Sequence, residues 1–285
     1  HWKWFRSVLN LVLARAIPFR SKSSKSHSKV ALMSNNIHPT ALVSEKALIG
    51  ENTTIGAFSI IHDNVVIGDN CQIDNYCELG YPTPLASGTP LTIGHQAIIR
   101  SHSVFYEGST FKDGLTTGHR VTVREGVSAG YNLQIGTLSD LQGDCLIGDY
   151  VRCHSKVHSG KASTIGNFGW IFPYCVLTKD PHPPSNTTQG VTIDDFAVIA
   201  TMTTLLPGVT IGTDSLVAAH SCVSKPVASN SVVGGSPAKH LCMTKDIKLK
   251  DGSGKPAYPW TNHFHRGYPE HIVNEWVANA DALKE

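Results

Sequence analysis

The sequence lacks several features that would point to particular classes of protein. Charged residues make up only 16% of the 285 residues, and the formal net charge is +2. Charge therefore gives no reason to expect binding to nucleic acid or to an acidic membrane surface. The apolar run near the start of the chain is interrupted by Arg15 and is too short to cross a bilayer. The seven cysteines include no CxxC pair, so a common zinc or redox motif is missing. We expect no nucleic-acid partner, no membrane insertion and no metal.

What the sequence does contain is a six-residue repeat. An aliphatic residue returns at every sixth position between residues 193 and 228, and the same period runs through residues 93–177 and 37–79. If this position is slot one, slot five is small or β-branched almost throughout. Hexads of this kind are typical of parallel β-helices, in which stacked neighbours bury a continuous core. Slots one and five are expected to face inward.

The length of the repeat sets the size of the predicted solenoid. Three hexads make one triangular coil, so the 29 hexads predict nearly ten coils. At the spacing of neighbouring strands, this gives an all-β prism on the order of 45 Å long. We predict one solenoid domain over residues 33–239.

The cysteines fit the interior of this solenoid. Cys71, Cys77, Cys145 and Cys175 occupy slot five, and Cys153 occupies slot one. Free cysteine behaves as a small buried hydrophobe and is common in reducing compartments. We interpret these cysteines as core residues and expect a cytoplasmic protein.

Residues 1–32 differ in character from the repeat. They contain no acidic residue, and an aromatic and aliphatic run precedes a stretch rich in serine and lysine. A targeting or membrane-surface helix is one interpretation. We favour a remnant of a vector, a fusion or upstream translation, because the sequence from Met33 has the character of a natural start.

Two interruptions and a tail complete the chain. Residues 80–92 and 179–192 are rich in proline and glycine, so they are predicted to leave the solenoid as corner loops that help form the site. In residues 240–285 we expect a flexible linker at 246–257. Apolar residues at helical spacing then predict an amphipathic helix at 269–284 that caps or braces the open end.

Histidine stands out among the residues that could carry chemistry. None of the eight histidines within the hexads occupies an inward slot. His119 and His154 are expected on the same face two coils apart, about 10 Å along the axis, and one substrate could span them. His158, Glu125 and further acid and amide groups are expected to project outward nearby. These further groups are Asn132, Asp140 and Asp144.

A zinc-dependent carbonic anhydrase on the same solenoid is an alternative, with His119, His154 and His158 as ligands. Equivalent ligands two coils apart would differ by 36 residues, whereas His119 and His154 differ by 35 and occupy different slots. Their side chains would leave the coil in different directions. The spacing therefore disfavours a shared metal.

The hexads resemble those of the hexapeptide-repeat acyltransferases, and this resemblance implies a left-handed solenoid. Four stretches resemble one branch more closely, the dTDP-3-amino-3,6-dideoxyhexose N-acetyltransferases. They are GHRVTVREG (118–126), the run 136–160, GWIFPYCVLTKDPHPPS (169–185) and PAYPWTNHFHRG (256–267). The resemblance implies acetyl transfer to a dTDP-linked amino sugar, of the kind used in O-antigen and S-layer glycans.

The branch also implies a homotrimer, with acetyl-CoA lying in the groove between two prisms. On that basis His154 is the residue predicted to engage the acceptor, and His119 the one predicted to orient it. The predicted substrate-binding residues are His158, Glu125, Asn132, Asp144 and Pro183. The predicted CoA-binding residues are Ala218, Ala219, Lys225, Gly235 and Lys239.

The resemblance leaves two points of mechanism and class open. Many hexapeptide transferases use a histidine followed by an Asp-Cys pair, and this string is missing here. The proton acceptor can therefore be a histidine or the departing CoA thiolate. Sugar O-acetylation and a non-catalytic solenoid that only binds a partner protein are further alternatives, since a fold alone does not fix a function.

Overall fold

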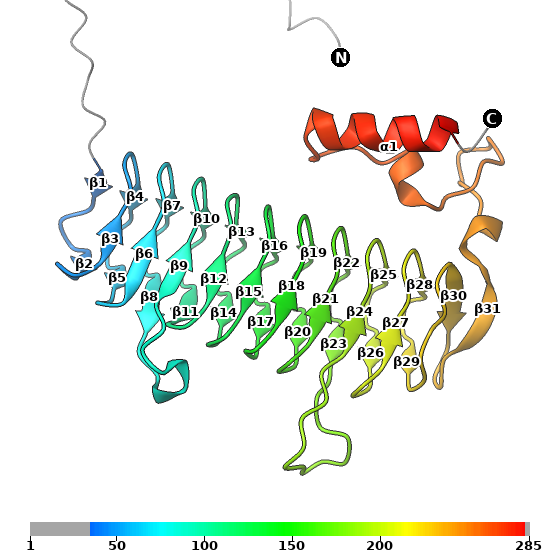
Figure 1. Ribbon diagram of the computed structural model, residues 1–285, viewed down its shortest axis with the longest axis horizontal. Helices are drawn as coiled ribbons and strands as arrows, with labels where there is room; N and C mark the ends of the chain where they lie inside the picture. Colours follow the sequence, from blue (N-terminus) through cyan, green and yellow to red (C-terminus); the bar gives the residue numbers. More distant parts are fainter. Residues whose placement is uncertain (1–34, 283–285) are drawn as a thin grey trace, which may run out of the picture. The chain divides into compact units, whose positions relative to one another are not determined.

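The structure is a computed structural model that describes residues 35–282. The prediction for residues 1–32 lies outside the described residues. From Asn36 onward the hexads form a left-handed parallel β-helix (Figure 1). Its strands lie in three flat faces, and each strand pairs in parallel with the strand one coil further along.

We name the faces A, B and C in the order in which the chain meets them. Face A contains β1 (Asn36–Ile37), β4 (Thr54–Ile55), β7 (Gln72–Ile73), β10 (Ile98–Ile99), β13 (Thr116–Thr117), β16 (Gln134–Ile135), β19 (Arg152–Cys153), β22 (Trp170–Ile171), β25 (Val198–Ile199), β28 (Leu216–Val217), β30 (Ser231–Gly234) and β31 (Lys239–Met243). Face B contains β2 (Leu42–Val43), β5 (Ile60–Ile61), β8 (Glu78–Tyr81), β11 (Val104–Tyr106), β14 (Thr122–Val123), β17 (Asp140–Leu141), β20 (His158–Ser159), β23 (Val176–Leu177), β26 (Thr204–Leu205) and β29 (Cys222–Val223). Face C contains β3 (Leu48–Ile49), β6 (Val65–Ile67), β9 (Leu91–Ile93), β12 (Thr110–Phe111), β15 (Ser128–Ala129), β18 (Leu146–Ile147), β21 (Thr164–Ile165), β24 (Thr192–Ile193) and β27 (Thr210–Ile211). The prediction of about ten coils is confirmed.

The hexad slots have the roles that the sequence predicted. Slots six and one form a short strand, slot one points inward, and slots two to five turn the corner. Slot five also points inward, so one core of aliphatic side chains runs through the solenoid from Ile55 to Val233. Ile37, in the first coil of residues 35–282, is 41% exposed because none of these described residues forms a coil that stacks on its outer side. The prediction that slots one and five face inward is therefore confirmed.

Polar residues in slot five are buried with their hydrogen bonds made. The Ser59 hydroxyl donates to the carbonyl oxygen of Asp74 at 2.8 Å and accepts from the backbone N–H of Cys77 at 3.0 Å. The cysteine thiols stay neutral, because burial raises the pKa of Cys77 to about 11 and that of Cys153 to about 12. These cysteines serve as core residues, as predicted.

Glycine in slot two allows the corners of successive coils to stack closely. The Asn167 side-chain oxygen accepts from the backbone N–H of Asp149 at 2.8 Å, across one coil. A Cβ on Gly148 would lie 2.6 Å from that oxygen and 2.7 Å from the backbone nitrogen of Asn167. The absence of a side chain at Gly148 is therefore a packing requirement.

Both predicted loops leave from the same corner, between faces B and C, which we call corner BC. The first joins β8 to β9 and contains the short helix η1 (Pro84–Ala86), and the second joins β23 to β24. Figure 1 shows both on the same side of the solenoid. The other corners are named AB and CA in the same way.

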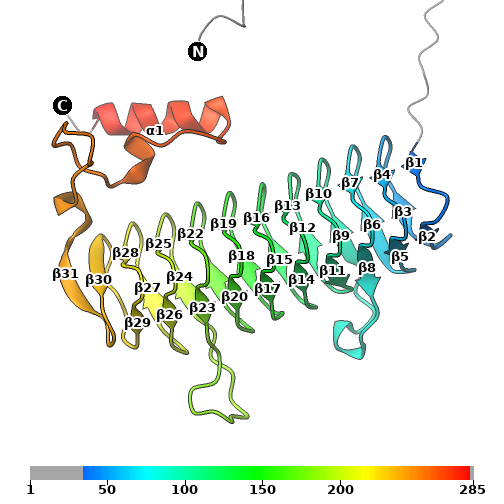
Figure 2. The ribbon, with the colours of Figure 1, turned by 180° about the vertical axis from the view of Figure 1, so that it is seen from behind.

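The C-terminal segment folds differently from the prediction in two respects. Residues 246–257 form a hairpin and not a flexible linker, with the Leu249 N–H donating to Lys255 at 2.9 Å. After η2 (Thr244–Asp246) and η3 (Trp260–Asn262), the helix α1 (Glu270–Ala282) confirms the predicted helix. It braces one side of the solenoid (Figure 2), because Trp276 packs against Phe168 and Phe196. The helix does not cap the open end of the solenoid. The edge of face A at that end is paired by β31, which is antiparallel to β30.

Of the helices in residues 35–282, none has the length and apolar character needed to cross a membrane.

The corner packing predicts that glycines in different slots respond differently to the same substitution. Gly148→Ala would force two coils apart and is expected to lower the free energy of unfolding by roughly 1–3 kcal/mol. Gly169→Ala is the control, because its Cβ would meet the end of Ile165 at 3.2 Å and the Gly166 carbonyl oxygen at an ordinary contact distance of 3.5 Å, in a slot that holds small side chains elsewhere. Urea unfolding followed by circular dichroism measures both. Equal losses in the two variants would contradict this account of slot two.

Candidate functional site

A cavity of about 340 Å³ lies on face A, next to the C-terminal segment. Successive strands β13, β16, β19 and β22 supply its floor, each through its slot-six side chain. The lining consists of Thr116, Thr117, Gly118, Gln134, Ile135, Gly136, Arg152, Cys153, His154, Ser155, Trp170 and Arg266. The solenoid thus provides every wall except the one that Arg266 contributes.

Arg152 joins the solenoid to the C-terminal segment. Its guanidinium lies over the rings of Trp170 and Tyr268, at 4.7 and 4.2 Å from their centroids. One Nη donates to the carbonyl oxygens of Arg266 and Gly267 at 3.2 and 3.0 Å. Gly267 has a φ of +81°, and a Cβ there would lie 2.9 Å from the guanidinium. Cation–π contacts and hydrogen bonds together fix the position of Arg152.

The cavity carries uncompensated positive charge. Within residues 35–282, neither Arg152 nor Arg266 forms an ion pair with a carboxylate. Burial lowers the pKa of Arg152, the phenolate of Tyr268 would raise it, and the charge of Arg266 lowers it further. Since arginine stays charged in proteins, two such groups favour an anion in the cavity.

His154 lies at the end of this floor where corner AB begins. The two preceding coils have Gly118 and Gly136 in the same slot. His154 is therefore the first of these three residues with a side chain beside the cavity. Its ring stacks on Phe172 with centroids 4.7 Å apart and lies at 5.7 Å from Trp170. The backbone is held because the His154 N–H donates to Ile171 at 2.8 Å. The imidazole is therefore presented in one orientation, half-buried against aromatic rings.

The surroundings of His154 favour its neutral form. Burial lowers the pKa of the imidazole, and the charge of Arg152 lowers it further. No hydrogen bond to its ring nitrogens is formed by the described part of the chain. A neutral imidazole with unpaired nitrogens can accept a proton from a bound ligand or bind it through a hydrogen bond.

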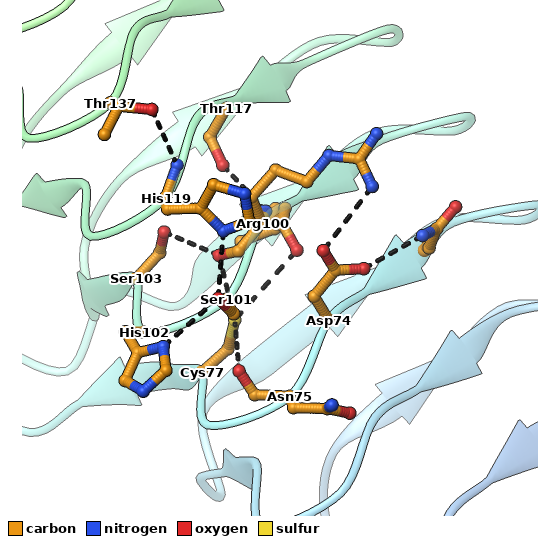
Figure 3. Close-up of polar contacts among 12 residues, drawn as sticks. Asp74, Asn75, Cys77, Arg100, Ser101, His102, Ser103, Thr117, His119 and Thr137 are labelled. Atoms are coloured by element: carbon orange, nitrogen blue, oxygen red, sulfur yellow. Dashed lines mark hydrogen bonds and ion pairs between the residues drawn. The ribbon is translucent and has the colours of Figure 1, made fainter.

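His119 lies on the same corner two coils from His154, as predicted, and directly follows the cavity residue Gly118. Its Nδ1 is 2.9 Å from the Ser101 hydroxyl, which is also 3.1 Å from Nδ1 of His102 (Figure 3). The backbone N–H of His119 donates to the Thr137 hydroxyl at 3.2 Å. A hydroxyl that donates once and accepts once holds the two imidazoles in complementary tautomers. His119 is exposed and fixed through one ring nitrogen.

The other predicted site residues are distributed over all three corners. On corner AB, Ala218 and Ala219 lie beyond His154 toward the end of the solenoid, and Gly235 follows them, since its N–H donates to Ser221 at 3.2 Å. On face B, His158 pairs with Asp140 at 3.1 Å. Burial raises the pKa of Asp140, but hydrogen bonds from His158 and Gln142 hold it below its ordinary value. The remaining predicted residues are Asn132 on corner CA, Glu125, Asp144, Lys225 and the loop residue Pro183 on corner BC, and Lys239 on β31.

The expectation that Glu125 projects outward to a substrate was wrong. Its side chain is only 4% exposed, and it pairs with Arg124 at 3.0 and 3.3 Å. A Cβ added to Gly108 would touch both Ala86 and the Cβ of Glu125, which places the first corner loop close to the Glu125 side chain. Slot three normally faces solvent, so the repeat gave no signal of this burial.

Sequence reasoning missed the two cavity arginines. Arg152 stands in slot six, two residues before His154, and Arg266 is the second-last residue of the stretch 256–267. Both therefore lie within or beside the stretches that carry the branch resemblance, and this was the available signal. Their proximity depends on a contact between segments 114 residues apart, which no local spacing reveals.

Histidine, cysteine, aspartate and glutamate do not gather in threes at any point of residues 35–282 where a metal ion could be held. His119 binds Ser101, and His158 binds Asp140 on another face. The geometry thus gives no support to the alternative of a shared zinc site.

Comparison with known proteins connects this fold to transferases. Residues 46–80 match the bacterial transferase hexapeptide (six repeats) family. Among solved structures, the chain is similar to the UDP-N-acetylglucosamine acyltransferase of Arabidopsis, with 18% identity over 73% of this chain and 74% of that one and a TM-score of 0.62. It is also similar to the UDP-N-acetylglucosamine acyltransferase of Bacteroides fragilis, with 20% identity over 83% and 80% of the two chains and a TM-score of 0.50. At these identities the likeness to the solved structures shows a shared fold.

The half-buried position of His154 predicts a pH dependence of stability. Because the folded state lowers its pKa, the unfolded chain takes up a proton first as pH falls. Its contribution to stability is complete above the ordinary histidine value near 6.5 and is lost as pH falls toward the lower pKa of the folded state. His154→Phe keeps the stacking on Phe172 and removes the titration.

We expect the unfolding free energy of the native chain to fall more steeply than that of His154→Phe between pH 6.5 and the folded pKa. Urea titrations at closely spaced pH values measure this difference. Parallel pH profiles for the two proteins would show that the folded state does not disfavour the protonated imidazole.

Proposed function

We propose that the protein is an acyltransferase that moves the acetyl group of acetyl-CoA to the amino group of a dTDP-linked 3-amino-3,6-dideoxyhexose. The observation that carries this proposal is the neutral, stacked imidazole of His154 at the rim of a positively charged cavity. The match of residues 46–80 to bacterial transferase hexapeptides supports the reaction class. The dTDP-sugar is inferred from the resemblance of residues 118–126, 136–160, 169–185 and 256–267.

The chemistry requires few groups from the protein. The neutral amine attacks the thioester carbonyl carbon, a C–N bond forms, and the C–S bond breaks to release the CoA thiolate. The nitrogen loses one proton, which passes to His154 or to the departing thiolate. General-base help from a positioned imidazole is typically about 10²–10⁴-fold. Depression of the imidazole pKa keeps His154 in the form that accepts a proton.

The acyl donor is proposed to lie along corner AB. In successive coils beyond His154, slot two holds Phe172, Ala200 and Ala218, so the side chains become small toward the end of the solenoid. Ala219 and Gly235 continue this narrow strip. An extended pantetheine arm can approach the backbone closely there, with its thioester directed toward His154. Lys239 on β31 lies at the end from which the CoA phosphates would project.

A trimer with sites between subunits would reconcile the positions of the remaining predicted residues. In one chain, the two loops, Asp144 and Lys225 lie on corner BC, and face B separates them from His154. They can take part in the site only when a neighbouring subunit places its corner BC against corner AB. The homotrimer is therefore part of the proposal, with Pro183 and Lys225 contributed by the neighbour.

Replacement of His154 tests the proposed function. His154→Asn is expected to lower kcat with saturating acetyl-CoA, by about two- to tenfold if His154 contributes only a positioning hydrogen bond worth roughly 0.5–1.5 kcal/mol. A fall of a hundredfold or more, with loss of the acidic limb of the pH profile, assigns the base to His154. A smaller fall with that limb retained assigns the proton to the CoA thiolate.

His95→Asn is the matched control for this measurement. His95 lies on corner CA, and its Nδ1 accepts from the backbone N–H of Asp69 at 2.9 Å. Asparagine can make the same contact, as it does in this slot elsewhere, so activity should be unchanged. Equal activity of His154→Asn and His95→Asn would remove His154 from the site.

A further inference from the structure

We propose that the C-terminal segment and face A together form a binding site for a nucleoside diphosphate, the nucleotide part of the acceptor. The base would occupy an apolar pocket beneath Trp260, and the two phosphates would bind Arg152 and Arg266. This inference rests on the proposed function. It assigns to residues 258–267 a role in substrate recognition in addition to bracing the solenoid.

The apolar pocket is the first observation. It has a volume of about 170 Å³ and lies between face A and the C-terminal segment. Its lining consists of Trp170, Phe172, Val198, Tyr258, Trp260, His263 and Phe264. Trp170 and Trp260 meet edge to face at 6.0 Å, and Phe264 meets Trp170 in the same way at 5.4 Å. Flat aromatic walls of this kind suit a planar heterocycle, which can stack on them.

The polar cavity beside it is the second observation. Arg152 and Arg266 stand without a carboxylate partner among residues 35–282, although eight ion pairs form elsewhere in that part of the chain. Arg152 is held by two cation–π contacts and two hydrogen bonds, whereas Arg266 is exposed, lines the cavity and lies over the ring of Phe264 at 5.6 Å. Two guanidinium groups that reach one cavity from different segments suit a diphosphate, which presents several oxygens in different directions.

Trp170 connects the two compartments, because it lines both. Its indole N–H donates to the Tyr268 hydroxyl at 3.0 Å, which fixes the ring. A ligand that places a flat ring on one side of Trp170 and negative charge on the other matches this arrangement. A nucleotide combines both properties in one molecule.

The position of His154 indicates whether the site holds the nucleotide of the acceptor or the nucleotide of CoA. His154 lines the polar cavity and also stacks against Phe172 and Trp170. A sugar attached to the diphosphate would therefore lie beside the imidazole that the proposed reaction requires. The strip proposed for the acyl donor runs along corner AB from Ala200 to Ala218 and Gly235, whereas the two compartments lie on face A against the C-terminal segment. The site on face A is thus assigned to the acceptor and not to CoA.

Calorimetric titration of the full chain with three probes tests the assignment. The probes are dTDP, thymidine, which lacks the phosphates, and pyrophosphate, which lacks the base. Arg266→Gln is expected to weaken dTDP and pyrophosphate about ten- to hundredfold and to leave thymidine unchanged. Tyr258→Leu replaces an aromatic wall of the apolar pocket at a residue that forms no cation–π contact within residues 35–282, and it is expected to weaken thymidine and dTDP but not pyrophosphate.

Arg120→Gln is the matched control, because it removes the same charge from an exposed position on corner AB outside the cavity lining. Equal affinities of Arg266→Gln and Arg120→Gln for dTDP would overturn the inference. Displacement of dTDP by CoA or 3′,5′-ADP would also overturn it, because it would assign the site to the donor. Acetyl transfer to an amino sugar without dTDP binding here would reject this inference alone. Binding of dTDP here without acetyl transfer would reject the proposed function.

Discussion

The stacking of each coil on the next, through parallel hydrogen bonds at a spacing of 18 residues, is the constraint on which the rest of the structure depends. It aligns equal slots of successive coils in rows along the solenoid, as Thr54 and Gln72 show on face A. A row can hold glycine for close packing or a side chain for function. Gly118, Gly136 and His154 occupy one such row. The two glycines leave space for the cavity, and the imidazole of His154 bounds it at the end of the row.

The same constraint explains why much of the fold could be predicted. Inward and outward slots, the coil number, the exit of both loops and the common corner of His119 and His154 all follow from counting in sixes. The same counting of hexads also predicts that Ala218 and Lys225 lie on different corners, since successive hexads occupy successive corners. The prediction grouped them because the resemblance placed both near CoA, without following the corner of each.

What the repeat could not reveal are contacts between the solenoid and segments outside its period. Glu125 is buried because a loop folds over a slot that is normally exposed. Arg152 becomes part of a cavity because Gly267 and Arg266, more than a hundred residues later, bring their carbonyl oxygens to it. Helix α1 lies along the side of the solenoid because the stacked rings of Tyr150, Phe168 and Phe196 offer Trp276 an apolar surface there. These are tertiary contacts, and they depend on shape and not on period.

We propose that the solenoid supplies the geometry of the site and that the short C-terminal segment supplies recognition of the acceptor. In this account, corner AB carries the acyl donor, His154 marks the point of reaction, and the aromatic and arginine-lined site holds the nucleotide of the acceptor. The stacking of coils fixes in advance the positions of the solenoid residues, and tertiary contacts with the solenoid position those of the C-terminal segment. A preformed arrangement of this kind reduces the entropy cost of bringing two substrates together.

The most direct test is to incubate the full chain with acetyl-CoA and a series of dTDP-linked 3-amino-3,6-dideoxyhexoses, measuring thiol release and the mass of the product. The account predicts release of CoA with at least one of these sugars and a monoacetylated product that survives mild alkali, as an amide does. No thiol release with any of the amino sugars, or a product that mild alkali cleaves as an ester, would contradict it.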